Sequence, residues 1–363
     1  MKMLVSILVV IALSIKALSV SAQSVYPHLN NDAGQEKNTL KLNFSAAANY
    51  SAQHKGLGVV VAINGEIVFE EYHKSYTADF CSYIHSGTKG FWGPVTALMI
   101  QEGLLQGYDQ KVSDILTEWK NIPVKQNITI RQLMELSSGL VNNLQKIEGH
   151  NPEEPDLYTY AAHNASFATK PGERFQYGPV NFYVMGAVMN RVLANAGSAY
   201  TNPLEYLEAK LFLPLGIQYE KWVFDKAGNP HLPNGACLTP RNWIKWGQFV
   251  LQKGEWEGKQ LIRRDLMEAL FVPSCANLGY GLFMWLNTRD GFGIVQEMRA
   301  PSGSAAGFMY YDGYPDIIGI LGAGPNRMYM IPSLNMVIVR QTPQIEISRK
   351  RFIDHEFLKQ LFN

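Results

Sequence analysis

The sequence predicts an α+β protein in which an antiparallel sheet, flanked by helices from the N- and C-terminal parts of the chain, is interrupted by a mostly helical domain. Three observations support this fold class. A β-hairpin pattern stands near the start, helical patterns fill the middle, and short apolar runs typical of strands return before a last helix. Such an order favours one sheet built from both halves of the chain. We therefore predict a discontinuous α/β domain, residues 23–104 and 279–363, and a helical domain, residues 105–278.

The first elements are a helix and a hairpin. Residues 36–55 predict a polar helix, and two β-branched apolar runs follow, over residues 57–63 and 66–72. Asn64 and Gly65 join these runs. An Asn-Gly pair predicts a tight hairpin because both residues tolerate a positive φ.

The remaining elements follow from apolar spacing and from the Gly and Pro residues that interrupt it. Helices are predicted over Lys89–Leu105, Ile130–Leu136, Asp156–Ala168, Asn181–Ala194, Leu204–Phe212 and Thr239–Leu251. Strands are predicted over Tyr280–Leu286, Ile317–Leu321, Met328–Ile331 and Met336–Arg340, and a final amphipathic helix over about Ser348–Leu361.

The first 22 residues have the layout of a secretory signal peptide: a basic start, an apolar run and small residues before an expected cleavage after Ala22. The apolar run is shorter than the roughly 20 residues that a membrane span needs, so export is favoured over anchoring. We expect a secreted or periplasmic protein with no stable membrane span after cleavage.

The charge balance bears on the partners. The chain of 363 residues has 32 Lys+Arg and 31 Asp+Glu, a formal net charge of +1. Removal of residues 1–22 takes away Lys2 and Lys16, so 30 basic residues face 31 acidic ones and the charge becomes −1. No basic stripe is present, which argues against nucleic acid as a partner. A small-molecule substrate is the expected partner, and the sequence indicates no oligomeric state.

Three cysteines, Cys81, Cys237 and Cys275, match no zinc-binding spacing. Cys237 and Cys275 are the candidates for a disulfide in an oxidising compartment. The alternative is that all three are small buried hydrophobic residues. The histidines form no cluster, so we expect no metal site, and no cofactor is indicated.

The most informative pattern is Ser86-Gly87-Thr88-Lys89. Residues i and i+3 of a helical turn share a face, so the hydroxyl of Ser86 and the amine of Lys89 can meet. A lysine whose pKa is lowered by burial can accept the serine proton and activate the nucleophile. The alternative is an N-cap serine followed by a solvated lysine.

Two further segments carry candidate groups. Tyr177 lies in a Pro/Gly-rich loop, where a phenol near a lysine can act as a general acid and base; the alternative is an amphipathic tyrosine at an interface. Residues 320–324 are apolar and then Gly-rich, which allows a ligand to approach the backbone and meet an N–H donor. The alternative is a core strand that enters a turn.

With these segments in this order, the chain resembles the serine β-lactamase and penicillin-binding-protein superfamily, in particular its class C β-lactamase and esterase-like branch. The landmarks cover nearly the whole mature chain and include Ser86-x-x-Lys89, residues 130–140, Pro171–Tyr177, Pro214–Gly216, Leu238–Arg241, Gly254–Gly258 and Tyr280–Leu282. The resemblance implies a β-lactamase/transpeptidase-like fold. It also implies that Ser86 is the acylated nucleophile, Lys89 its base and Tyr177 the second acid/base.

Two positions depart from the family pattern. The second motif is commonly Tyr-x-Asn, but Pro179 stands at the Asn position and Asn181 lies two residues further on. The third motif usually begins with Lys or His, where this chain has Ile320, followed by Leu321 and Gly322. Asn181 and Gly322 are the candidate residues at the substrate-binding edge of the site, and Asn181 is the nearest amide that could stand in for the missing one. No cation at position 320 is present to hold a substrate carboxylate.

The missing groups serve recognition more than bond cleavage. The backbone N–H groups of Ser86 and Ala323 still provide a predicted oxyanion hole, because backbone donors need no particular side chain. We therefore expect an exported serine hydrolase that cleaves an ester or amide with an uncharged acyl-side neighbour, rather than a true β-lactamase. No Gly-x-Ser-x-Gly elbow supports an α/β-hydrolase. Two alternatives remain: a non-catalytic ligand-binding member of the same fold, or a β-lactamase or D-alanyl peptidase.

Overall fold

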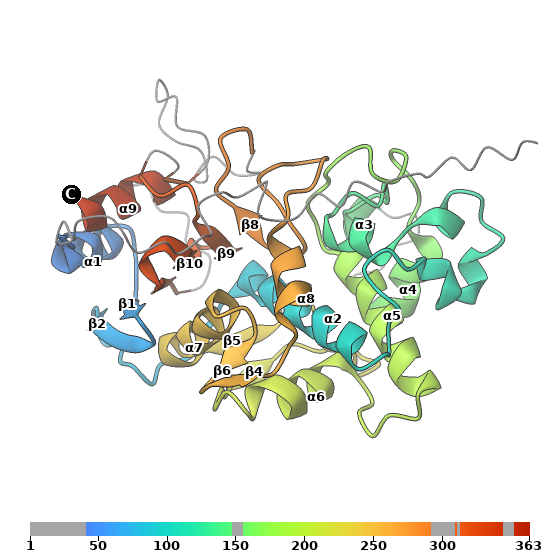
Figure 1. Cartoon of the computed structure of the whole chain (residues 1–363), viewed down its shortest axis with the longest axis horizontal. Helices are drawn as coiled ribbons and strands as arrows, with labels where there is room; N and C mark the ends of the chain where they lie inside the picture. Colours follow the sequence, from blue (N-terminus) through green and yellow to red (C-terminus); the bar gives the residue numbers. More distant parts are fainter. Residues whose placement is uncertain (1–40, 147–154, 292–308, 311–312, 344–351) are drawn as a thin grey trace, which may run out of the picture.

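The computed structural model describes residues 41–146, 155–291, 309–310, 313–343 and 352–363 (Figure 1). The predicted signal peptide, the first residues of the helix predicted over 36–55 and the start of the helix predicted over 348–361 lie outside these ranges.

A six-stranded antiparallel sheet draws its strands from both halves of the chain. Its order is β2-β1-β11-β10-β9-β8, so the N-terminal hairpin lies directly beside the last strand. The strands are β1 (Gly58–Ile63), β2 (Glu66–Tyr72), β8 (Trp285–Leu286), β9 (Ile318–Gly322), β10 (Asn326–Ile331) and β11 (Met336–Gln341). Strands β9, β10 and β11 are buried along their whole length. Continuous apolar runs of this kind are typical of strands that are covered on both faces.

The predicted hairpin is present. Asn64 and Gly65 connect β1 to β2 and have φ values of +52° and +88°. A residue with a β-branched side chain would be strained at either position, so the Asn-Gly pair sets the turn. The predicted strand over residues 280–286 is wrong in extent, since only Trp285 and Leu286 pair with β9.

Helices cover both faces of the sheet. Helix α1 (Phe44–Gln53) packs against the C-terminal helix α9 (Asp354–Phe362), and α7 (Pro240–Leu251) lies across β1, β10 and β11 on the other side (Figure 1). Helix α7 begins where the sequence predicts it, because Thr239 caps the N–H of Asn242 and Pro240 occupies the first turn. Gly247 of α7 lies so close to Met328 and Val337 that a side chain there would collide with both.

Most of the middle of the chain is helical, and apart from α7 its helices lie to one side of the sheet (Figure 1). The helices are α2 (Trp92–Gln101), α3 (Ile130–Met134), α4 (Leu157–Asn164), α5 (Val180–Asn195), α6 (Pro203–Leu207) with a π-helical continuation over Glu208–Phe212, and α8 (Arg264–Glu268). Five short strands were not predicted: β3 (Ser82–Tyr83), β4 (Lys221–Trp222), β5 (Ala236–Leu238), β6 (Glu255–Trp256) and β7 (Lys259–Gln260). Strands of two or three residues are too short for an alternating pattern to identify.

The cysteines pair differently from the prediction. Cys81 forms a disulfide with Cys237, while Cys275, the predicted partner of Cys237, is exposed and free. The pairing of two strands that are distant in the sequence decides which cysteines meet. Strand β3 pairs with β5 so that Tyr83 lies opposite Cys237, which brings Cys81 to a Cα–Cα distance of 5.7 Å from Cys237.

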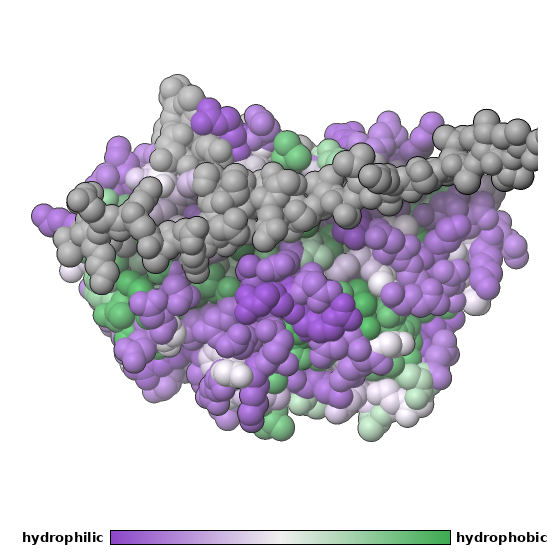
Figure 2. All heavy atoms as spheres, in the orientation of Figure 1, coloured by the Kyte–Doolittle hydropathy of each residue, from purple (hydrophilic) through white to green (hydrophobic). Residues whose placement is uncertain are grey.

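No helix in the described part of the chain is long and apolar enough to cross a bilayer. Figure 2 shows one face of the molecule, which is mostly hydrophilic with small hydrophobic patches between the polar side chains.

Candidate active site

Ser86 and Lys89 lie together in a tight 3₁₀ segment, His85–Phe91, which runs directly into α2. The sequence placed the start of a single helix at Lys89 and its end at Leu105; the segment starts at His85 instead, and α2 ends at Gln101. The difference matters for the site, because a 3₁₀ helix has three residues per turn and residues i and i+3 eclipse each other. The Nζ of Lys89 lies 3.0 Å from the Oγ of Ser86.

Small residues allow this segment to pack tightly. A Cβ at Gly87 would lie 2.8 Å from the ring of Trp243, and a Cβ at Gly90 would lie 2.6 Å from the side chain of Ile320. His85, directly before the predicted nucleophile, has a φ of +49°, in the left-handed region. That conformation costs about 1–2 kcal/mol in a residue other than glycine, so packing around the segment must hold it.

Lys89 is buried among carbonyl and aromatic groups. Its Nζ donates to the backbone carbonyl of Pro233 at 2.8 Å and lies 5.1 Å from the ring centroid of Tyr177 and 5.2 Å from that of Phe182. Among the described residues no carboxylate forms an ion pair with it. Burial therefore lowers the pKa of Lys89 to about 7, so much of the amine is neutral and able to accept a proton at neutral pH.

Tyr177 completes the group of three. Burial raises the pKa of Tyr177 to about 12, while a hydrogen bond with Ser86 and the positive charge of Arg327 act in the opposite direction. The phenol is therefore protonated at neutral pH and able to donate. The ring centroids of Trp285 and Tyr177 lie 5.5 Å apart. The structure thus brings together the three side chains that the sequence proposed as catalytic.

The loop that carries Tyr177 is held by a residue that was not predicted, Asn142. Its Oδ1 accepts from the N–H of Val180 at 2.8 Å and of Asn181 at 3.3 Å, which caps the start of α5, and its Nδ2 donates to the carbonyl of Gln176. The side chain of Asn181 is buried, and its Oδ1 accepts from the Oγ of Ser138 at 2.6 Å. The substrate-binding role of Asn181 stays a prediction.

The end of β9 lies against the 3₁₀ segment. A Cβ on Gly322 would lie 2.1 Å from the carbonyl oxygen of Ile84 and 3.1 Å from the backbone nitrogen of Gly87. Only a glycine permits this approach, which brings the neighbouring Ala323, the second predicted oxyanion donor, to the region of Ser86. Ile320 is buried against Gly90, so an apolar side chain occupies the place where the resemblance expects a cation.

A buried arginine on the next strand contacts the end of β9 from the face of the sheet opposite to Ile320. Arg327 of β10 lies opposite Leu321 in the sheet register, and its Nη1 donates to the carbonyl of Gly322 at 2.7 Å. No local pattern in the sequence distinguishes Arg327, Asn142 or the carbonyl of Pro233 as site groups, because each reaches the site only through long-range packing. The described residues hold no group of three or more His, Cys, Asp or Glu side chains that would bind a metal ion.

Comparisons with known proteins identify the family and the fold. Residues 43–340 match the Beta-lactamase family. An uncharacterised protein of Alkalihalophilus pseudofirmus is 23% identical over 314 residues, which cover 78% of this chain and 83% of the relative.

Solved structures are similar over most of the chain. A putative β-lactamase from Bacteroides dorei matches with a TM-score of 0.67 at 17% identity, covering 89% of this chain and 99% of that one. A penicillin-binding protein homologue from Caulobacter crescentus gives 0.66 at 15% identity, covering 88% and 96%. A putative 6-aminohexanoate-dimer hydrolase from Bacillus anthracis gives 0.64 at 18% identity, covering 86% and 79%.

These matches confirm the predicted β-lactamase/transpeptidase-like fold, with an antiparallel sheet and helices. They also confirm the resemblance on which the sequence interpretation rested, and the fold is that of serine hydrolases. On the match over residues 43–340, the chain belongs to the β-lactamase family.

Proposed function

We propose that this protein is an exported serine hydrolase that cleaves an ester or amide through an acyl-enzyme on Ser86. The observation that carries the proposal is the 3.0 Å contact between the Oγ of Ser86 and the Nζ of Lys89, whose pKa burial lowers to about 7. A serine hydroxyl is a weak nucleophile until a neighbouring base takes its proton, and a neutral lysine at this distance is such a base.

The reaction follows from this geometry. Neutral Lys89 takes the proton of Ser86 while Oγ attacks the substrate carbonyl, and the N–H groups of Ser86 and Ala323 stabilise the resulting oxyanion. Tyr177, protonated at neutral pH, delivers a proton to the leaving group, and Lys89 restores the proton of Tyr177. Water then attacks the acyl-enzyme, and its proton returns to Ser86 through the same groups.

An uncharged acyl group fits the site best. Ile320 is buried beside the 3₁₀ segment, and Pro179 stands where the family commonly has an amide side chain. A substrate carboxylate next to the scissile carbonyl finds no side-chain cation at these two positions. One structural neighbour is named as a putative 6-aminohexanoate-dimer hydrolase, and we keep an amide beside an ester as the scissile bond.

Two observations support export. Residues 1–22 have the signal-peptide pattern, and the Cys81–Cys237 disulfide is of the kind that persists in oxidising compartments. Alkylation of the native protein isolated from its producing cells should label Cys275 alone, and Cys81 and Cys237 only after reduction. The mature N-terminus in the same sample should begin at Gln23. Labelling of all three cysteines without reduction, or an intact N-terminus, would argue against export.

The test of the activity compares the wild type with Ser86→Ala on a chromogenic acetate ester. We expect the variant to lose turnover by at least about 10⁴-fold, since the nucleophile is removed. A fluorophosphonate should label the wild type on Ser86, located by peptide mass mapping. Equal rates for both proteins would refute the catalytic proposal and leave a ligand-binding member of the fold. Hydrolysis of a cephalosporin faster than of the ester would favour the β-lactamase alternative.

A further inference from the structure

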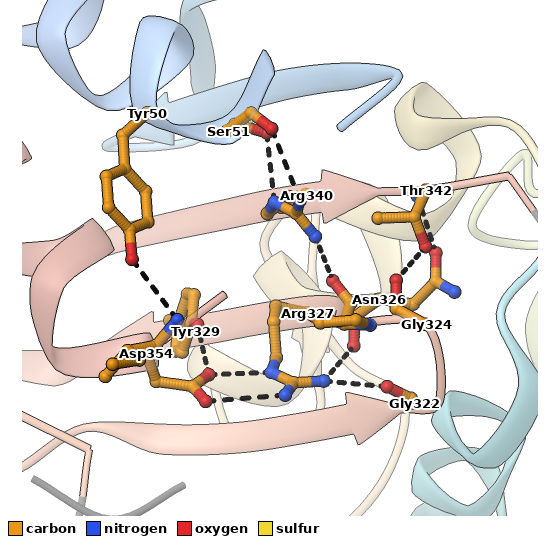
Figure 3. A network of polar contacts seen from close by, with 12 residues as sticks. Tyr50, Ser51, Gly322, Gly324, Asn326, Arg327, Tyr329, Arg340, Thr342 and Asp354 are labelled. Carbon is orange, nitrogen blue, oxygen red and sulfur yellow. Dashed lines mark hydrogen bonds and ion pairs between the residues drawn. The ribbon is translucent and has the colours of Figure 1, made fainter. Parts of the chain in front are cut away.

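The turn between β9 and β10 is held through its carbonyl groups. Each of the five consecutive carbonyl oxygens from Gly322 to Asn326 accepts a hydrogen bond from a side chain. Figure 3 shows the contacts of Arg327 with Gly322 and of Thr342 with Gly324. The donors are the Nη1 of Arg327 to Gly322 (2.7 Å) and to Asn326 (3.1 Å), the Nδ2 of Asn326 to Ala323 (2.8 Å), the Oγ1 of Thr342 to Gly324, and the Nη1 of Arg340 to Pro325 (2.5 Å).

One of these carbonyls is tied to the proposed chemistry by the geometry of the peptide bond. The C=O of Gly322 and the N–H of Ala323 belong to the same planar trans peptide, so they point in opposite directions. When Arg327 binds the carbonyl from one side, the N–H of Ala323 is directed away from the guanidinium. Gly322 itself abuts the backbone of Ile84 and Gly87, on either side of Ser86.

Arg327 is anchored by an ion pair with Asp354 of the C-terminal helix α9. The guanidinium is buried, with its Nε 2.6 Å from Oδ1 and its Nη2 3.4 Å from Oδ2 of Asp354, the first residue of α9 (Figure 3). Tyr329 donates a further hydrogen bond to Asp354. The planar fork of an arginine engages a carboxylate on one edge and carbonyls on another, which a lysine amine cannot do.

We propose that Arg327, anchored by Asp354, is a positioning residue that aims and polarises the Gly322–Ala323 peptide, so that its N–H serves as an oxyanion donor. This inference rests on the proposed acyl transfer at Ser86. A charged donor on a carbonyl strengthens the opposite N–H as a donor, because hydrogen bonds in series polarise one another. Arg327 thus acts on the site from the opposite face of the sheet, through the Gly322–Ala323 peptide bond.

The test compares two buried arginines on neighbouring strands. Arg327→Lys removes the guanidinium that joins Asp354 to the carbonyl of Gly322. Arg340→Lys is the matched control: Arg340 is fully buried, lies opposite Arg327 in the register, and binds Pro325 and the end of α1 rather than Gly322. The measurements are kcat and KM on the chromogenic ester, the rate of fluorophosphonate labelling, and the thermal midpoint.

We expect Arg327→Lys to lower kcat about 10–100-fold with KM within about threefold of wild type, because loss of one oxyanion donor costs about 10²–10³-fold and here the donor is misaligned rather than removed. Labelling should slow by the same factor. Arg340→Lys should lose similar thermal stability and keep kcat within about threefold. An equal loss of kcat in both variants, or a rise in KM alone for Arg327→Lys, would overturn the positioning role.

A second variant covers the case in which Arg327→Lys does not fold. Asp354→Asn keeps the guanidinium but weakens its anchor, and we expect kcat to fall about 3–10-fold with KM unchanged. A folded Asp354→Asn protein with wild-type kcat would refute the inference. The comparison of wild type with Ser86→Ala separates a failure of the proposed acyl transfer from a failure of the positioning role of Arg327. Turnover that does not depend on Ser86 removes the proposed function and this role with it, whereas Ser86-dependent turnover with wild-type kcat in Arg327→Lys removes the positioning role alone.

Discussion

Two buried lysines in this protein have similar surroundings of backbone carbonyls and aromatic rings. Lys89 donates to the carbonyl of Pro233 and Lys125 to the carbonyls of Ala162 and His163, and each amine lies 5.1 Å from an aromatic ring centroid. Burial lowers the pKa of Lys89 to about 7 and that of Lys125 to about 8. Among the described residues, neither amine has a carboxylate within ion-pair distance.

The difference that bears on chemistry is the hydroxyl of Ser86, which contacts Lys89 and has no counterpart among the hydrogen-bond partners of Lys125. A lowered lysine pKa therefore does not mark a catalytic site by itself, since carbonyl-lined burial produces it in both places. A lowered lysine pKa indicates a catalytic base only where a nucleophile also lies within hydrogen-bond distance and an oxyanion donor lies nearby.

Between the two lysines, the largest expected difference appears when each is replaced by methionine, which keeps the length of the side chain. Lys89→Met should lower kcat on the ester about 10³-fold, because the base for Ser86 is lost. Lys125→Met should leave kcat within about twofold of wild type. Steady-state kinetics on both folded variants measures the contrast. Comparable losses would mean that the Ser86 contact does not distinguish the two lysines.

Removal of the Tyr177 hydroxyl should have the next largest effect. Tyr177→Phe keeps the ring beside Trp285 and Lys89 but deletes the proton donor, so kcat should fall about 10²-fold. Tyr183→Phe, on α5, is a control that changes a buried tyrosine without a contact to Ser86. If ester turnover in the Tyr177→Phe protein matched that of the control, leaving-group protonation would have to come from Lys89 or water.

The pH dependence tests the state of Lys89 directly. The base must be neutral, so the rate of Ser86 labelling should reach a plateau above about pH 7 and fall about tenfold for each pH unit below it. Lys125→Met should not move this inflection. A rate that is flat between pH 5 and 8 would show that Lys89 does not act as the base.

The smallest expected effect concerns stability. The pKa of Lys125 is about 8 in the folded protein and near the ordinary lysine value of 10.5 in the unfolded chain. Between these values the unfolded chain binds more protons, so the stability that this group contributes rises with pH from about 8 to 10.5 and is lost as the pH falls. The urea midpoint of the wild type, relative to that of Lys125→Met, should therefore increase from pH 8 to pH 9 and again to pH 10. A constant difference would argue for an unshifted amine.

Local features of the site were predictable because they depend on nearby residues. Ser86 and Lys89 meet in any helical turn, since three positions separate them. Asn64 and Gly65 dictate a hairpin through their own backbone preferences. The finer form of the site was not predictable: the 3₁₀ geometry depends on the packing of Gly87 against Trp243, which is distant in the sequence.

The sequence by itself determined the fold class, the hairpin and the Ser86–Lys89 pair, because periodicity, turn chemistry and helical spacing act over a few residues. Only the tertiary structure decided what surrounds that pair. The carbonyl that accepts a hydrogen bond from Lys89 belongs to Pro233, 144 residues away. Cys237 forms its disulfide with Cys81, 156 residues away, and not with the nearer Cys275. Arg327 reaches the carbonyl of Gly322 only because strand β10 pairs with β9 in this register. These contacts depend on which strands and loops become neighbours, and that choice minimises the free energy of the whole packed core rather than of any local segment.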